Sequence, residues 1–245
     1  LRHLQGADDR DMTSVGLRED VALPSAERLD GIRLGVPEEL SGDGIDAGVR
    51  DAFQRSLALA QELGATVEEC RLPHAPHALS AYYILAPAEC SSNLARFDGV
   101  RYGLRRDADT LLDLYTGTRH DGFGPEVKRR VMLGTYALSS GYYDAYYGKA
   151  QRVRTKIAED FATAFERFDF IVTPTSPSVA FELGAKTDDP LSMYLNDFCT
   201  VPMSLAGIPA ISIPNGIADG LPTGLQLAAP AFAENRLLDA AHALD

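Results

Sequence analysis

The chain has 245 residues, of which 45% are hydrophobic and 24% are charged, a composition typical of a globular protein with a sizeable core. The formal net charge is −12, and no run is rich in Lys and Arg, which excludes a surface built to hold the phosphates of nucleic acids. No apolar run approaches the roughly 20 residues that a membrane span needs. Three widely spaced cysteines, Cys70, Cys90 and Cys199, argue against a disulfide framework and predict a reducing, cytoplasmic location.

The first third of the chain predicts a strand, a helix and a second strand. Apolar residues alternate over 32–36, as in a strand, and recur at helical spacing over 49–60, where Gly64 predicts the end of the helix. Residues 66–69 again have the pattern of a strand. This order indicates a βαβ unit with a right-handed crossover on a parallel or mixed sheet.

The middle of the chain, residues 75–168, has few helix breakers and predicts several helices, the last of which keeps one apolar face over 153–168. Without a repeat, a low-complexity tract or a linker, the chain is expected to form one α/β domain over residues 1–245. A mixed sheet covered by helices would carry this helical excursion in its middle.

The last third of the chain returns to strands. Residues 170–173 form a short apolar run that ends at Pro174. Residues 210–214 and 225–228 repeat the pattern, and 233–244 predicts a final helix that covers them.

Several polar groups could belong to a catalytic or metal site, and each also has a structural explanation. His74 and His77 could share a helix face for a metal, but the prolines beside them break such a helix and favour a surface loop. Ser139 and Ser140 could include a nucleophile, but they are expected within a helical stretch, without the strand-to-turn elbow of such serines.

The cysteines and tyrosines favour structural interpretations. Cys90 and Cys199 have no nearby histidine in sequence and are expected to be buried structural thiols. Four tyrosines between Tyr142 and Tyr147 lie at helical spacing, which favours packing in the core or against another protein chain.

Two charged residues, Arg130 and Asp197, are each followed by apolar residues. Taken alone they would be a solvated basic face and a local cap, because most charges lie on the surface. The sequence blocks around these two residues are longer than a basic face or a local cap requires. They are Gly124–Thr135, Ser139–Tyr147, Ser91–Leu94 with Arg96–Gly99, Asp189–Leu191 with Asn196–Asp197, and Leu205–Pro209.

These blocks resemble the amidase-signature family of hydrolases and, within it, the A subunits of the tRNA-dependent amidotransferases. The resemblance implies a catalytic serine, a bridging serine and a lysine in a Gly/Ser-rich segment, none of which is in this chain. The opening residues, Gly6–Ser14, resemble the stretch that follows this segment, so the nucleophile is expected upstream of Leu1. A start without methionine agrees with a C-terminal portion of a longer protein.

The resemblance also implies a glutamine site. It places Arg130 on the α-carboxylate and Asp197 on the α-ammonium, and a tyrosine, either Tyr83 or Tyr82, in the same pocket. A guanidinium fork and a carboxylate satisfy both charges of a free amino acid and leave its side-chain amide to reach the nucleophile.

The implied activity is hydrolysis of glutamine to supply ammonia for Gln-tRNA(Gln) or Asn-tRNA(Asn) synthesis. Subunits B and C would be partners, and tRNA would be held only through a partner, which uses ATP and Mg²⁺. No cofactor is expected in this chain. Two alternatives remain: a stand-alone amidase, for which a zwitterion clamp has no purpose, and a non-catalytic amide- or amino-acid-binding module.

Overall fold

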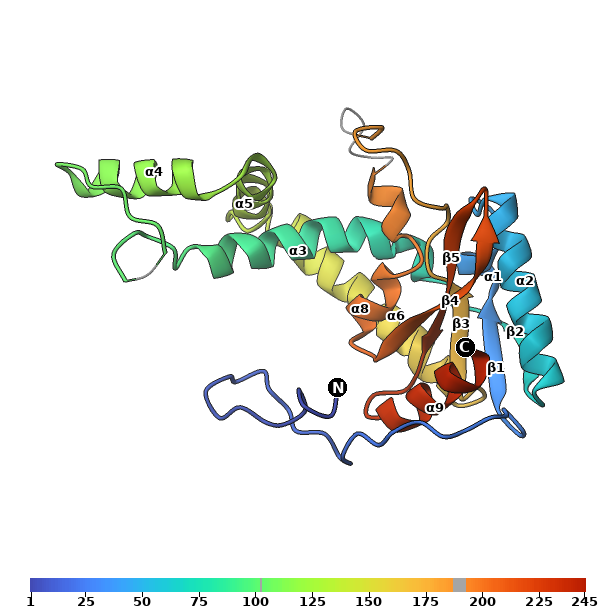
Figure 1. The fold of residues 1–245 in the computed structure, drawn as a ribbon. Coiled ribbons are helices and arrows are strands. Elements are labelled where there is room, and N and C mark those ends of the chain that lie inside the picture. The colour runs from blue at the N-terminus through green and yellow to red at the C-terminus, as the bar shows by residue number, and fades with distance from the viewer. Residues whose placement is uncertain (102, 187–192) are drawn as a thin grey trace. The chain divides into compact units, whose positions relative to one another are not determined.

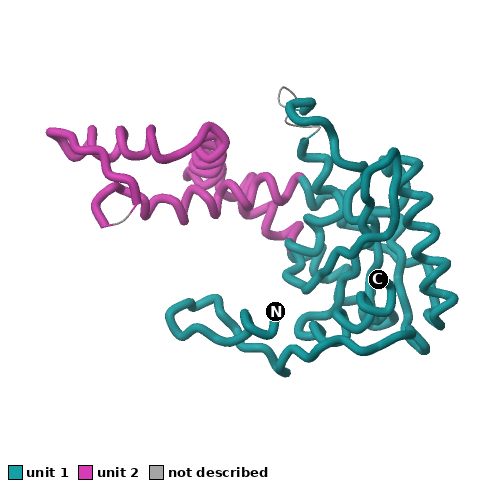
Figure 2. The backbone as a smooth tube through the Cα atoms, viewed as in Figure 1, with its two compact units in different colours: residues 1–79, 155–245 teal, residues 80–154 magenta. Residues whose placement is uncertain are grey.

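The computed structural model describes residues 1–101, 103–186 and 193–245, which fall into two compact units (Figure 2). Unit 1 contains residues 1–79 and 155–245, and unit 2 contains residues 80–154. The helical segment expected over 75–168 includes the whole of unit 2. None of the described helices is long and apolar enough to cross a membrane.

Unit 1 contains a five-stranded mixed sheet with the strand order β2-β1-β3-β5-β4 (Figure 1). Strands β1 and β2 are parallel, as are β1 and β3, whereas β5 runs antiparallel to both β3 and β4. The sheet confirms the predicted α/β class. Its strands are β1 (Arg33–Pro37), β2 (Thr66–Cys70), β3 (Phe170–Pro174), β4 (Ala210–Ala218) and β5 (Leu221–Ala228).

The predicted βαβ unit is confirmed by the parallel pair β1 and β2 and the helix between them, α2 (Ala47–Glu62). Buried residues on α2 recur every three or four positions, so that one face packs on the sheet. The chain turns out of the helix at Gly64, whose φ is +101° and where a Cβ would lie 2.1 Å from Asp30 Oδ1. Glycine is therefore required at this helix end.

Strands β4 and β5 form a hairpin that is longer than the sequence pattern predicts. Asp219 (φ 50°) and Gly220 (φ 77°) make the turn, and Asp-Gly is a typical hairpin sequence. The prediction stopped at residue 214 and resumed at 225 because prolines at 214 and 222 interrupt the alternating pattern. Only the pairing with the neighbouring strand extends both strands.

The principal core of unit 1 lies between the sheet and two helices, α2 and α9 (Glu234–Leu244), the second of which confirms the predicted last helix. Phe53 and Phe170 are among its fully buried side chains. Burial of a side chain of this size contributes about 1.5–3 kcal/mol. Other short elements among the described residues of unit 1 are α1 (Glu38–Ser41), η1 (Ala75–His77), η3 (Leu195–Asp197) and α8 (Val201–Ala206).

Unit 2 is helical, as predicted. Its helices α4 and α5 lie entirely within it, and its ends fall inside α3 and α6 (Figure 1). The prediction of an unbroken helix around Ser139 and Ser140 is wrong, because α5 ends at Ala137 and these serines lie in a turn. The elements are α3 (Ala78–Leu94), α4 (Leu111–Gly122), α5 (Pro125–Ala137), the π-helical turn η2 (Asp144–Gly148) and α6 (Lys149–Phe165).

Candidate functional site

The candidate carboxylate-binding group, Arg130, lies in the second turn of α5. Gly124 is the N-cap and Pro125 the first helical residue, which suits a position whose backbone N–H has no partner within the helix. Glu126 follows in the first turn, where a negative charge interacts favourably with the helix dipole. Because residues four apart lie on the same side of a helix, Glu126 and Arg130 are neighbours.

Arg130 is held by two contacts within unit 2. Its Nε donates to Glu126 Oε1 at 2.8 Å, and Nη1 donates a long hydrogen bond to the phenolic oxygen of Tyr82 at 3.5 Å. The hydrogen bond with Glu126, and then that with Tyr82, raises the pKa of Arg130. The same bond, followed by one from Arg129, lowers the pKa of Glu126. Both groups are therefore charged at neutral pH.

Tyr82, on α3, is the tyrosine that lies against Arg130. The ring of the neighbouring Tyr83 packs edge-on against that of Tyr82, with 5.0 Å between the ring centroids. The choice between these two tyrosines as a pocket residue stays a prediction. The geometry gives Tyr82 the direct contact with the guanidinium.

Asp197, in unit 1, ends the short helix η3. The side chain is exposed, and nothing in the described part of the chain forms a hydrogen bond or an ion pair with its carboxylate. Its backbone carbonyl accepts a hydrogen bond from Thr200 N at 3.1 Å, which stabilises the turn that follows. Asp197 thus presents a negative charge that can bind an ammonium group. The related block Asp189–Leu191 lies outside the described residues.

The segment after Asp197 is fixed to the sheet by a buried amide. Gln226, on β5, is 5% exposed, and its Nε2 donates to Cys199 O at 2.8 Å and to Thr173 Oγ1 at 2.9 Å. Cys199 itself is fully buried. The backbone two residues beyond Asp197 is therefore bound to the central strands.

The other candidate nucleophiles and bases have structural roles. The Ser139 hydroxyl donates to Tyr136 O at 2.7 Å, and in the described residues neither Ser139 nor Ser140 contacts a basic side chain. Asp160 accepts hydrogen bonds from the backbone N of His74 at 2.7 Å and pairs with its ring Nδ1 at 2.9 Å, which fixes the loop before η1. No group of three His, Cys, Asp or Glu residues suited to a metal occurs within the ranges that the structure describes.

The cysteines differ from the expectation in one case. Cys199 is buried, as predicted, and so is Cys70. Cys90 is only half-buried, so the expectation of a buried thiol is wrong there. It lies on α3, whose neighbours cover that side only in part. The tyrosines of the 142–147 segment are also partly exposed, because they follow the break in α5 and do not form a continuous buried stripe.

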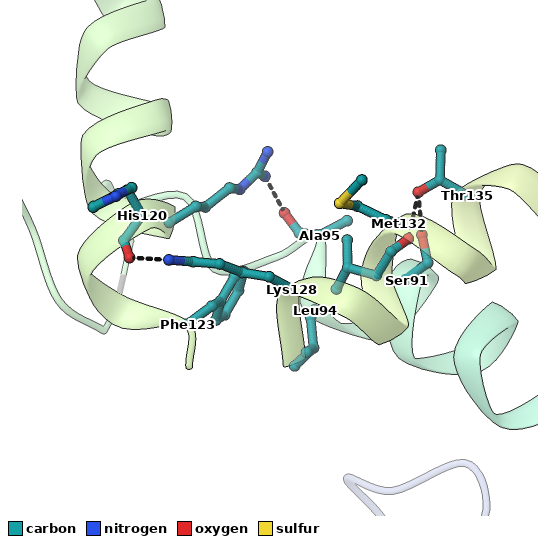
Figure 3. A pocket seen from close by; sticks show the side chains of 10 residues that line it. Ser91, Leu94, Ala95, His120, Phe123, Lys128, Met132 and Thr135 are labelled. Atoms are coloured by element: carbon teal, nitrogen blue, oxygen red, sulfur yellow. Dashed lines mark hydrogen bonds between the residues drawn. The ribbon is translucent and has the colours of Figure 1, made fainter. Parts of the chain in front are cut away.

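A separate cavity of about 410 Å³ lies within unit 2, between the ends of α3 and α4 and the side of α5 (Figure 3). Its walls are largely apolar, and Lys128 Nζ donates to His120 O at 2.6 Å at its edge. Neither Arg130 nor Tyr82 lines it. This cavity is therefore distinct from the candidate carboxylate site.

Two residues, one beside Arg130 in unit 2 and one that holds the segment after Asp197 in unit 1, were missed by sequence reasoning. Glu126 could have been found, because a Glu four residues before an Arg on a helix is a known favourable pair. Gln226 had no such signal, because its partners Thr173 and Cys199 are far away in sequence.

Comparison with known proteins places these features in context. The family model for amidases matches residues 1–238. Over 242 residues the chain is 55% identical to the A subunit of glutamyl-tRNA(Gln) amidotransferase from Symbiobacterium thermophilum, covering 98% of this chain and 50% of that protein. It is 52% identical over 251 residues to the corresponding protein of Geobacillus stearothermophilus, covering all of this chain and 51% of that one. The chain thus spans about half the length of these relatives.

Solved structures show the same fold. The A subunit of glutamyl-tRNA(Gln) amidotransferase from Thermotoga maritima matches with a TM-score of 0.76 and 38% identity, covering 98% of this chain and 47% of that one. A bacterial aryl acylamidase of the amidase-signature family matches with a TM-score of 0.72 at 20% identity, over 98% of this chain and 48% of that one. At such low identity the second match concerns the fold alone.

Proposed function

The chain belongs to the amidase family, and we propose that it is the glutamine-binding portion of the ammonia-generating A subunit of a tRNA-dependent amidotransferase. The observation that carries this proposal is the arrangement at Arg130, where Glu126 binds Nε of the guanidinium and Tyr82 binds Nη1. Such a group binds a carboxylate through parallel hydrogen bonds. Arg130 is the residue for which the resemblance implies contact with the α-carboxylate of glutamine.

Glutamine is a zwitterion, so its recognition needs an anionic group as well as Arg130. In this proposal the Asp197 carboxylate, which is exposed and without a partner among the described residues, binds the α-ammonium. The charges at both ends of the substrate backbone would then be compensated. The uncharged side-chain amide would be left to enter the reaction site.

The chemistry itself would use groups from the half of the relatives that this chain does not span. A serine hydroxyl attacks the amide carbon, ammonia leaves with the transferred proton, and water hydrolyses the resulting glutamyl ester to glutamate. The ammonia would pass to a partner subunit, which uses ATP and Mg²⁺ to activate the glutamate or aspartate attached to tRNA. Subunits B and C would complete this assembly, and tRNA would be bound through the partner.

The test is a glutaminase assay of this chain alone and together with the other half of the protein supplied in trans. We expect activity only in the combined sample. Arg130→Ala should then lower kcat/KM about a hundredfold, because a buried substrate carboxylate loses its charged partner. Asp197→Asn should also lower kcat/KM for glutamine. Arg28→Ala, which removes an exposed ion pair with Asp30, is the control.

The outcomes separate the alternatives. A stand-alone amidase for other amides would hydrolyse a neutral amide as well as glutamine, and Arg130→Ala would leave its kinetics unchanged. A non-catalytic binding module would bind glutamine without hydrolysis in either sample. Activity of this chain alone would contradict the assignment of the nucleophile to the other half.

A further inference from the structure

Glu126 lies between two arginines on α5, and its two carboxylate oxygens make different contacts. Oε1 accepts a hydrogen bond from Arg130 Nε at 2.8 Å. Oε2 accepts from Arg129 Nε at 2.9 Å and also from Arg129 Nη2. The carboxylate is therefore shared between both guanidiniums, one oxygen to each.

This sharing determines which N–H groups of Arg130 remain available. A guanidinium has five N–H groups and can bind a carboxylate side-on, through Nε and one Nη, or end-on, through both Nη atoms. Glu126 uses only the Nε group, and Tyr82 accepts from Nη1. The other N–H groups of Arg130 have no partner in the described residues. The end-on edge is thus largely open for a carboxylate.

Glu126 contacts Arg130 from the side, at Nε, whereas a carboxylate bound end-on would use the two Nη atoms. The two carboxylates therefore use different N–H groups of the same guanidinium.

We propose that Glu126 is a positioning residue that orients Arg130 through Nε and leaves the end-on edge of the guanidinium for the carboxylate of the substrate. This inference rests on the proposed function, because it concerns the same α-carboxylate. It adds that the affinity for glutamine depends on an internal carboxylate, that of Glu126, which holds Arg130 without touching the substrate.

Two variants have different expected effects. Glu126→Ala removes the anchor of Arg130 and should raise the KM for glutamine about tenfold, the effect of one charge-assisted hydrogen bond, with kcat within about twofold of the parent. Glu126→Gln keeps an oxygen that can accept from Arg130 Nε and should restore most of the affinity.

The experiment measures kcat and KM for glutamine in the combined two-half sample, and also for glutamine α-amide, which lacks the α-carboxylate. Glu126→Ala should leave the KM for the α-amide unchanged, a selectivity that a general loss of structure would not produce. Glu159→Ala removes another exposed helix ion pair, with Lys156, and is the matched control. Thermal unfolding of each variant identifies any loss of folded protein.

The results distinguish this inference from the proposed function. If Arg130→Ala costs about a hundredfold and Glu126→Ala leaves the glutamine KM unchanged, the positioning role is wrong and the proposed function stands. If Arg130→Ala itself has no effect, the proposed function fails. Equal losses for glutamine and its α-amide in Glu126→Ala would make Glu126 a structural residue only. Should Glu126→Ala not fold, the same comparison with Glu126→Asp, whose shorter side chain moves the carboxylate away from Arg130 Nε, decides the matter.

Discussion

Arg130 Nη1 lies 3.5 Å from the phenolic oxygen of Tyr82, so that helix α3 supplies a second contact to the guanidinium that Glu126 holds on α5. Tyr82→Phe removes this acceptor and should raise the KM for glutamine about three- to tenfold, the effect of one long hydrogen bond between the guanidinium and an uncharged acceptor. Tyr83→Phe is the matched control and should have a much smaller effect. Steady-state kinetics of both variants checks this prediction. A larger rise in KM for Tyr83→Phe than for Tyr82→Phe would assign the pocket to Tyr83.

Helices α3 and α5 cross closely at Gly134. A Cβ there would lie 1.9 Å from Pro87 O and 2.8 Å from Ser91 Cβ, so that one backbone has to move. Gly134→Ala should destabilise the protein by about 1–3 kcal/mol or more, as overpacking does. Because the same two helices carry Tyr82 and Arg130, the KM for glutamine should rise as well.

Urea unfolding measures the effect of Gly134→Ala, and Gly117→Ala on α4 is its control. A methyl group at position 117 meets only Arg106 Cβ at 3.8 Å. Since alanine favours helix over glycine by up to about 1 kcal/mol, this variant should be as stable as the parent or slightly more stable. Equal stabilities for the two variants would contradict the close crossing.

Gln226→Met keeps the side-chain volume but removes the amide that donates to Thr173 Oγ1 and Cys199 O. A buried acceptor without its donor costs about 1–3 kcal/mol, so the midpoint of urea unfolding should fall accordingly. The same substitution at Gln54, which is exposed on α2, should change stability little. A stability loss no larger at 226 than at 54 would show that the Gln226 hydrogen bonds contribute nothing.

The three thiols should differ in reactivity. Burial raises the pKa of Cys199 to about 12, and burial followed by the charge of Glu39 raises that of Cys70 to about 12. At pH 8 roughly one in ten thousand of these thiols is ionised, and the thiolate appears only as the pH approaches 12. Iodoacetamide at pH 8 should therefore modify the half-buried Cys90 first.

Mass spectrometry of the labelled peptides measures this order. Added denaturant should make Cys70 and Cys199 react as fast as Cys90, because the effect of burial is lost on unfolding. Rapid labelling of Cys199 in the native protein would show that its surroundings in unit 1 open readily.

The elements that could be predicted from sequence are those whose pattern is local. The βαβ unit, the helical middle and the last helix follow from apolar spacing over a few turns or a few alternating residues. The hairpin β4–β5 was predicted too short, because prolines interrupt its pattern and only the register with the neighbouring strand extends it. The turn at Ser139 and the exposure of Cys90 likewise depend on packing.

At the candidate site, the sequence by itself determined which charges are present, because the block around Arg130 and the pair Asn196–Asp197 carry the family resemblance. The Glu126–Arg130 pair, although it was missed, could also have been predicted from sequence, since spacing of four along a helix makes the two residues neighbours. Only the tertiary structure places Tyr82 against the Arg130 guanidinium. Successive residues point about 100° apart around a helix, so the crossing of α3 with α5 selects which tyrosine contacts Arg130, whereas the pocket tyrosine stays a prediction. The tertiary structure also brought Gln226 to Cys199, because residues distant in sequence meet only when the sheet has formed.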